Sequence, residues 1–212
     1  MTFSTDLRQK AAPMWDAEKQ HPFIVGIGDG TLSVDSFRYY MQQDYVFLVD
    51  FCRVIAMGAA KAQDVADMGW FARLLDETLN NEMALHIGFC KEFGITEEDL
   101  KNTIPSPTTV AYTNHLLESA YSGGVGETAA AILPCSWGYA EIGQMLHHRE
   151  PIIDQPLYTR WIEMYSSSEV ADLATWLRSF VDRSAVMTGA DARGRMEEVF
   201  LVSSRYEYMF WD

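Results

Sequence analysis

Two acidic residues interrupt predicted helix faces that are otherwise apolar. Asp44 lies in the middle of a stripe with steps of three and four residues, which reads Phe37, Tyr40, Met41, Asp44, Phe47, Leu48, Phe51, Val54 and Ile55. Glu207 holds the same kind of position in the stripe Met196, Val199, Phe200, Ser203, Tyr206, Glu207 and Phe210. Because an isolated buried carboxylate is costly, each must be paired, hydrogen-bonded or protonated. A structural partner, such as an arginine or a buried hydroxyl group, is one interpretation, and a functional site is the other.

A thiol occupies a similar position in a third predicted helix. Cys135 belongs to the stripe Thr128, Ala131, Ile132, Cys135, Tyr139, Ile142 and Leu146, and it directly follows Pro134. A lone cysteine on such a face is usually a small core residue. A proline inside a helix, however, frees a carbonyl group and kinks the axis, and a kink can open a cavity in a bundle. Cys135 is therefore a candidate nucleophile as well as a candidate core residue.

Glu82 and His86 are one helical turn apart and suggest a metal site. They lie in the stripe Leu75, Thr78, Leu79, Glu82, Met83, His86 and Cys90. A di-iron bundle needs Glu-x-x-His pairs on two helices and further carboxylates. The chain has 5 histidines, and its one Glu-x-x-His spacing, Glu18 to His21, ends directly before Pro22. The sequence therefore favours a Glu–His pair that holds helices together, and predicts no metal site.

Aromatic residues lie at or beside these unusual positions and indicate the kind of ligand. They are Tyr40, Tyr45, Phe47, Tyr112, Tyr139, Tyr165 and Phe210. Aromatic rings can stack on a flat heteroaromatic ligand, and carboxylates can accept hydrogen bonds from its N–H groups. Acidic side chains also select a basic or neutral ligand over an anionic one.

Long helical segments position these residues. Strand signals are nearly absent, because Asp29-Gly30 is the one hairpin candidate and it precedes a helix start at Ser33. Gly94 ends a helix, Thr96 to Asp99 resembles a capping box with a variant acid, and Pro151 and Pro156 frame a connection. We expect an all-α bundle that forms a single domain over residues 1–212. The helices are predicted over residues 4–20, 23–27, 34–61, 65–93, 108–123, 127–148, 157–165, 169–187 and 191–211.

The composition limits the classes of function. The 212 residues are 48% hydrophobic and 22% charged, with a net charge of −14, so a globular fold is expected. The negative charge argues against binding to nucleic acid or to an anionic membrane surface. No stretch approaches the length of a membrane helix, and Met1 to Lys10 is too polar for a signal peptide. The odd set Cys52, Cys90 and Cys135 indicates free thiols in a reducing compartment, so the sequence predicts a cytoplasmic protein.

Three segments resemble the signatures of the TenA (thiaminase II) family. The first runs from His21-Pro-Phe23 through Gly30-Thr-Leu32 and Phe37-Arg-Tyr-Tyr40 to Gln43-Asp44-Tyr45. The second is Leu133-Pro-Cys135-Ser-Trp-Gly-Tyr139, and the third is Tyr206-Glu207-Tyr-Met-Phe210-Trp211. The resemblance covers essentially the whole chain. It implies the haem-oxygenase-like all-α fold without haem or another cofactor, and a homotetramer.

The resemblance also implies an activity. Cys135 places the chain in the cysteine-containing branch of that family, which hydrolyses 4-amino-5-aminomethyl-2-methylpyrimidine to the hydroxymethyl pyrimidine and ammonia in thiamin salvage. Cleavage of thiamin itself to pyrimidine and thiazole is the second implied activity. The partners expected are therefore a small aminopyrimidine or thiamin, with no nucleic acid and no membrane.

The family's residue roles can be carried over position by position. The match implies that Asp44 binds the exocyclic amino group and a ring nitrogen, Cys135 adds to the ring, and Glu207 transfers protons at the opposite nitrogen. It further implies that the pocket is lined by Phe47, Tyr112, Tyr139, Tyr165 and Phe210. Many members carry a tyrosine where this chain has Phe47, so at that position stacking is expected without a hydroxyl contact.

Two other functions compete with this interpretation. A haem-oxygenase-like di-iron oxidase shares the fold and would use Glu82 and His86. A non-catalytic pyrimidine-binding or regulatory protein is the other alternative. Exposed aromatic residues such as Trp161, Trp176 and Trp211 are a weak sequence argument for the expected oligomer.

Overall fold

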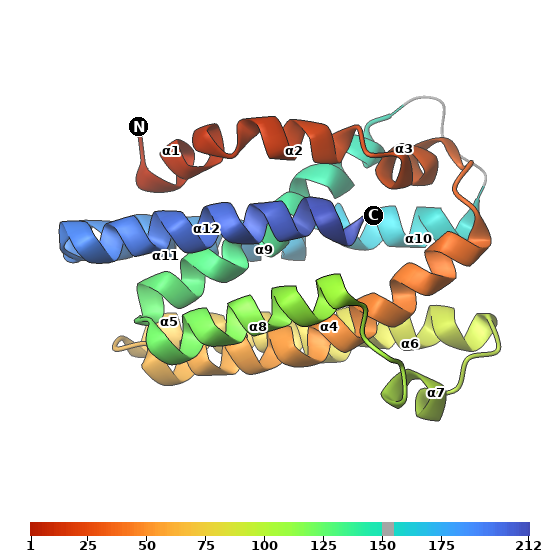
Figure 1. The fold of residues 1–212 in the computed structure, drawn as a ribbon, viewed down its shortest axis with the longest axis horizontal. Helices are drawn as coiled ribbons and strands as arrows, with labels where there is room; N and C mark the ends of the chain where they lie inside the picture. The colour runs from red at the N-terminus through yellow and green to blue at the C-terminus, as the bar shows by residue number, and fades with distance from the viewer. Residues whose placement is uncertain (150–154) are drawn as a thin grey trace.

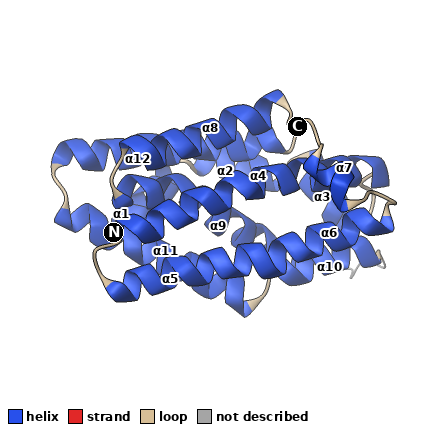
Figure 2. Ribbon diagram, turned by 90° about the horizontal axis from the view of Figure 1, so that it is seen from below, coloured by secondary structure: helices blue, strands red, loops and turns tan. Residues whose placement is uncertain are grey.

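The computed structural model describes residues 1–149 and 155–212, and over these residues the chain consists of helices and loops (Figures 1 and 2). The predicted all-α fold is thus confirmed, whereas Pro151, predicted to frame a connection, lies outside the described residues. The elements are α1 (Phe3–Lys10), α2 (Ala12–Lys19), α3 (Pro22–Asp29), α4 (Val34–Lys61), α5 (Val65–Glu77), the π-helical turn η1 (Thr78–Glu82), α6 (Met83–Glu92), α7 (Glu97–Lys101), α8 (Pro107–Ser122), α9 (Val125–His147), α10 (Pro156–Tyr165), α11 (Ser168–Met187) and α12 (Ala190–Phe210).

Local sequence signals set many of the helix ends. The hydroxyl group of Ser33 accepts a hydrogen bond from the Ser36 amide (3.0 Å) at the start of α4, as the sequence predicted. Thr96 and Asp99 form the predicted capping box of α7, with Thr96 N 2.8 Å from an Asp99 carboxyl oxygen and Asp99 N 3.1 Å from the Thr96 hydroxyl oxygen. Gly30 ends α3 in the left-handed conformation (φ 77°), which glycine adopts without strain.

The predicted first helix over residues 4–20 is wrong, because the structure divides it into α1 and α2 at Ala11. Pro13 explains the break. A proline has no N–H group to donate to the carbonyl group four residues earlier, here that of Gln9, and its ring clashes with that carbonyl. Pro13 therefore lies in the first turn of a new helix, where the missing donor costs little.

The predicted continuous helix over residues 65–93 is also interrupted. Between α5 and α6 the chain forms the π-helical turn η1, which fits an additional residue into the helix. The added residue changes which side chains face inward, so Leu79 is 46% exposed although the predicted stripe placed it inside. Thr78, Met83, His86 and Cys90 are buried as predicted.

Helix α9 lies at the centre of the molecule, where it packs against α4, α8, α10, α11 and α12 (Figure 1). Most of its residues are buried on every side, which is typical of a helix in the middle of a core. Trp161, Trp176 and Trp211 are 0%, 8% and 4% exposed, so the argument that they form exposed aromatic contacts of an oligomer is wrong. No helix among the described residues is long and apolar enough to cross a membrane.

Two hydrophobic clusters make up the core, and they meet near the middle of α9. One contains residues of α1, α2, α5, α8 and α11, and the other contains residues of α3, α6 and α10. Tyr45, Cys135 and Phe210 pack against both clusters. The predicted nucleophile therefore lies where the two clusters meet.

A glycine permits the close approach of α9 and the end of α10. A Cβ atom built on Gly143 would lie 2.4 Å from the carbonyl carbon of Tyr165, whereas one built on Gly138 would have no neighbour within 4 Å. Backbone atoms cannot move aside as a flexible side chain can, so α10 must shift if residue 143 carries a methyl group.

We expect Gly143→Ala to lower the free energy of unfolding by about 1–3 kcal/mol, the usual cost of overpacking a core. The matched control is Gly138→Ala in the same helix, where alanine should be neutral or stabilise the fold by up to about 1 kcal/mol. Urea unfolding followed by circular dichroism measures both. Equal stability of the two variants would contradict the close contact between α9 and α10.

Candidate active site

Buried polar side chains gather where the two clusters meet, and they come from six helices and the π-helical turn. Asp44 and Phe47 lie on α4, Tyr112 on α8, Cys135 and Tyr139 on α9, Tyr165 on α10, and Glu207 and Phe210 on α12. Of these elements, α4, α8, α10 and α12 all pack against α9. The sequence did not include Tyr40, Glu82 or His86 among the site residues, but these three also lie here.

Asp44 is bound by two side chains. It is 3% exposed and accepts a hydrogen bond from the Tyr40 hydroxyl group (3.0 Å) through Oδ2. The same oxygen is 2.7 Å from Nε2 of His86. Nδ1 of His86 is 2.7 Å from the main-chain carbonyl oxygen of Glu82, so Nδ1 must be protonated. Although burial alone would lower the pKa of His86, its hydrogen bond to the Asp44 carboxylate and the negative charge of that group raise it. The predicted partner hydroxyl is present, and His86 is a second partner.

The predicted pairing of Glu82 with His86 is wrong at the level of the side chains. His86 contacts the Glu82 main chain, while the Glu82 carboxyl oxygen Oε1 accepts a hydrogen bond from the Tyr165 hydroxyl group (2.6 Å). Among residues 1–149 and 155–212, no group of three His, Cys, Asp or Glu side chains is arranged to hold a metal ion.

Glu207 is also buried but has a different environment. It is 3% exposed, and Tyr112 donates a hydrogen bond to its Oε1. Burial raises the pKa of Glu207 well above its ordinary value, and the negative charge of Glu18 raises it further, against the opposing effect of Tyr112. This shift favours the protonated form of Glu207, which can donate a proton.

Cys135 lies next to this carboxyl group. It is partly exposed, and α9 continues through Pro134. Burial raises the pKa of the Cys135 thiol well above its ordinary value, and the charges of Glu207, Glu82 and Asp44 raise it further. The resting residue is consequently a thiol, and its proton must be removed when sulfur forms a bond.

Aromatic rings form the walls around these groups. The Phe47 ring centroid is 4.9 Å from that of Tyr112 and 5.5 Å from that of Phe210. On the other side, the rings of Tyr139 and Tyr165 are 4.8 Å apart. The arrangement offers aromatic faces on both sides of the polar groups.

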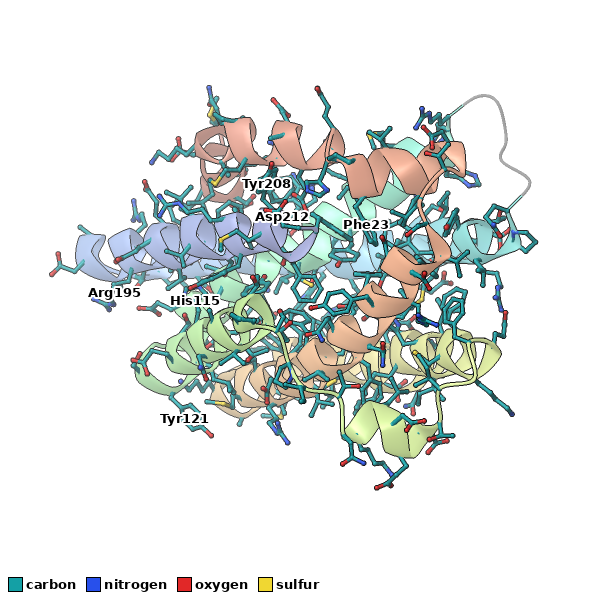
Figure 3. All side chains as sticks on the ribbon, turned by 45° about the vertical axis from the view of Figure 1, so that its right-hand side comes forward. Phe23, His115, Tyr121, Arg195, Tyr208 and Asp212 are labelled. Carbon is teal, nitrogen blue, oxygen red and sulfur yellow. The ribbon has the colours of Figure 1, made fainter. Side chains whose placement is uncertain are left out.

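Two hollows border this region. A cavity of about 50 Å³ is lined by Cys135, Ser136, Tyr139, Tyr165 and Glu82. A groove of about 620 Å³ at the surface is lined by Phe23, Tyr40, Gln43, Phe210 and Asp212, and Phe23 and Asp212 mark it in Figure 3. Of the predicted site residues, Cys135, Tyr139 and Tyr165 thus line the cavity and Phe210 lines the groove.

Comparisons with known proteins find sequences similar to the whole chain. A sequence profile of the TENA/THI-4/PQQC family matches residues 8–212. A relative from Halalkalibacterium halodurans, named aminopyrimidine aminohydrolase, is 42% identical over 212 residues, covering 100% of this chain and 95% of its own.

The fold is shared with solved structures. The TenA homologue from P. horikoshii OT3 has a TM-score of 0.90 and 29% identity, covering 100% of this chain and 97% of its own. A domain of unknown function with a haem-oxygenase-like fold from Shewanella denitrificans has a TM-score of 0.74 and 17% identity, covering 98% of this chain and 90% of its own. These similarities confirm the predicted haem-oxygenase-like fold.

A further buried carboxyl group near the site makes stability depend on pH. Glu18 is 3% exposed, and its Oε1 accepts a hydrogen bond from the indole N–H of Trp211 (2.8 Å). Burial raises the pKa of Glu18 from 4.5 to about 7. Because the folded state binds this proton more tightly, the stabilising contribution is complete below pH 4.5 and is lost as the pH rises through about 7.

In the wild-type protein, ionisation of Glu18 should lower the free energy of unfolding by about 2–3 kcal/mol between pH 5 and pH 8. We expect this part of the decrease to be absent in Glu18→Gln. Glutamine keeps an acceptor for Trp211 but does not ionise. Urea unfolding at several pH values measures the slope. Glu118→Gln, an exposed substitution with the same change of charge, should leave the slope unchanged. An unaltered slope in the Glu18 variant would contradict the raised pKa.

Proposed function

The chain belongs to the TENA/THI-4/PQQC family, and on that premise we propose that it is an aminopyrimidine aminohydrolase. The substrate is 4-amino-5-aminomethyl-2-methylpyrimidine, which is hydrolysed to the 5-hydroxymethyl pyrimidine and ammonia. Thiamin is the second substrate and gives pyrimidine and thiazole, so the enzyme serves thiamin salvage. One observation supports this function above the others: the Cys135 thiol lies beside the Glu207 carboxyl group, whose pKa is raised by burial, and the hydrogen-bonded Asp44 lies in the same buried region.

The two carboxyl groups fit two edges of the pyrimidine. Asp44 has one oxygen occupied by Tyr40 and His86, which leaves Oδ1 for the exocyclic amino group and the adjoining ring nitrogen. Burial raises the pKa of Glu207 and favours its protonated form, which suits the opposite ring nitrogen because that nitrogen is basic. The ring stacks between the aromatic walls that include Phe47, Phe210 and Tyr139.

Cys135 acts as the nucleophile. Its sulfur forms a bond to the ring carbon beside the nitrogen that Glu207 serves, and the thiol proton passes through the Glu207 carboxyl group to that nitrogen. The ring loses its aromaticity, and its electrons expel the amine from the methylene group. Water then adds to the methylene carbon. The proton returns from nitrogen to sulfur as the carbon–sulfur bond breaks.

The hydrogen bonds of Glu82 and His86 favour this function over a di-iron oxidase. Glu82 binds Tyr165, and His86 binds Asp44 and the Glu82 main chain, so both side chains have roles in the protein itself. We further propose that residues 1–212 form a single domain, that the enzyme assembles as a homotetramer, and that it acts in the cytoplasm. The three free cysteines suit a reducing compartment.

A steady-state assay with the aminomethyl pyrimidine and with thiamin tests the function. We expect the wild-type protein to hydrolyse the aminomethyl pyrimidine with release of ammonia. Cys135→Ser should remain folded and lose at least about 1,000-fold in kcat, because a hydroxyl group is a far weaker nucleophile than a thiol. Cys90→Ser, at a buried thiol whose pKa is affected by burial alone, is the control. Near wild-type turnover in Cys135→Ser would remove this residue from the mechanism.

The two carboxyl groups should respond differently to amide substitution. Asp44→Asn places a donor where acceptors are needed, and we expect a loss of about 2–4 kcal/mol in transition-state stabilisation together with weaker binding of the product pyrimidine. Glu207→Gln should nearly abolish turnover and spare product binding. Calorimetric affinity and turnover, measured for both variants, decide the roles. Loss of binding in Glu207→Gln and its retention in Asp44→Asn would reverse them.

A further inference from the structure

Glu82 is the last residue of the π-helical turn, and the mechanism above does not use its side chain. π-helical turns inside helices are rare and frequent at functional sites, since the added residue redirects the side chains that follow. Here the turn places Glu82 at the central cavity, where it lies with Cys135 and Tyr165.

The Glu82 carboxyl group is only partly occupied by the protein. The Tyr165 hydroxyl group donates to Oε1 (2.6 Å), and within the described part of the chain no other hydrogen bond to the carboxyl group is found. No lysine or arginine among the described residues forms an ion pair with it, so it is not one half of a structural salt bridge. Burial raises the pKa of Glu82 from 4.5 to about 7, which allows the group to accept and donate protons near neutral pH.

The cavity beside Glu82 is lined mostly by apolar side chains, has room for a small molecule, and offers that molecule a few polar groups. A water molecule needs about 10–15 Å³, and the cavity offers about 50 Å³. The Ser136 hydroxyl oxygen also lines it, is buried, and has no hydrogen-bond partner among the described residues. Buried hydroxyl groups are almost always hydrogen-bonded, so this oxygen is available to a ligand in the cavity.

The proposed substrate orientation directs its leaving group towards this cavity. In the pyrimidine the aminomethyl carbon is attached between the carbon that bears the amino group and the carbon that sulfur attacks. Asp44 binds the amino group on one neighbouring carbon, and Cys135 attacks the other neighbouring carbon. The leaving group therefore lies between these two residues. His86 joins Asp44 to the Glu82 main chain, and Glu82 and Cys135 line the same cavity.

We propose that Glu82 is a second acid–base residue. It binds the ammonium group of the substrate before the carbon–nitrogen bond breaks, and it then takes a proton from the water that replaces the amine. This inference rests on the proposed function. The substrate amine is protonated, so the carbon–nitrogen bond breaks with its electron pair leaving on neutral ammonia. Glu82 accepts one proton as water forms the new carbon–oxygen bond, and it transfers that proton to ammonia, which leaves as ammonium. Glu207 transfers protons between the thiol and the ring nitrogen, and Glu82 transfers protons between the water and the amine.

Two substrates with different leaving groups test this division. The thiazole nitrogen of thiamin bears no proton, so Glu82 has no ammonium group to bind in this substrate. The value of kcat/KM for thiamin covers the steps up to departure of the thiazole and should therefore depend little on Glu82. We expect Glu82→Gln to lower kcat/KM for the aminomethyl pyrimidine about 100-fold or more and that for thiamin about tenfold or less. Glu118→Gln, which removes an exposed carboxyl group on α8 away from this cavity, should change both values less than about threefold.

The outcomes separate this inference from the function on which it rests. Wild-type protein that cleaves neither substrate overturns the proposed function. If the wild-type protein is active, two results for Glu82→Gln overturn only the role of Glu82. One is an equal loss of kcat/KM on both substrates, and the other is no loss on either. Ser136→Ala should shift the ratio of the two kcat/KM values in the same direction by about threefold to tenfold.

The wild-type protein gives an independent test if Glu82→Gln does not fold. The ratio of kcat/KM for the aminomethyl pyrimidine to that for thiamin should rise as Glu82 ionises between pH 5.5 and pH 8, with a midpoint near 7. Groups that act on both substrates cancel in the ratio, and a ratio that does not change with pH overturns the proposal. The titratable groups that face Glu82 are Asp44 and Cys52 on α4, Glu77 on α5, His86 on α6, Cys135 and Tyr139 on α9, and Tyr165 on α10.

Discussion

A carboxyl group inside an apolar core must find hydrogen-bond donors or bind a proton, and the centre of this bundle depends on how its carboxyl groups meet that requirement. Asp44 is stabilised by a tyrosine and a histidine that is itself held by a main-chain carbonyl group. Glu207 has a tyrosine donor and forms no ion pair with the described residues, and burial raises its pKa well above the ordinary value. Two chemically similar side chains thereby have different hydrogen-bond environments within one site, and acid–base catalysis relies on such differences.

Much of this arrangement could be predicted from the sequence, because a polar residue in a regular apolar stripe is informative. Every residue of the α4 stripe around Asp44 is buried, and the capping residues at Ser33 and Thr96 act as expected. These predictions succeed because helical periodicity and end signals are local properties of the chain. The partner of Asp44 was not predictable in the same way. His86 is 42 residues away, and nothing in its own stripe indicates which helix it faces.

The π-helical turn is the most consequential feature that the sequence did not reveal. Residues Thr78 to Glu82 have no glycine or proline to mark an irregularity, so the pattern predicts one continuous helix. Tertiary contacts select the wider turn. It leaves Leu79 exposed and yet keeps both Glu82 at the cavity and His86 against Asp44. A regular helix continuing from α5 would carry Leu79 and Glu82 together on one face, so Leu79 would also face the cavity.

The close approach of α10 to α9 connects packing to chemistry. Gly143 brings the backbone at Tyr165 against α9, and from there the Tyr165 hydroxyl group reaches Glu82. On the same helix Cys135 and Tyr139 point into the cavity that Glu82 closes. A single central helix thus carries the thiol, part of the aromatic wall and the glycine that positions the tyrosine partner of a carboxyl group. Because α9 is buried on nearly every side, it can move little, and the groups that must meet the substrate keep fixed relative positions. The meeting of two core clusters at Cys135 therefore places the reacting sulfur where packing holds it firmly and polar groups from the neighbouring helices can reach it.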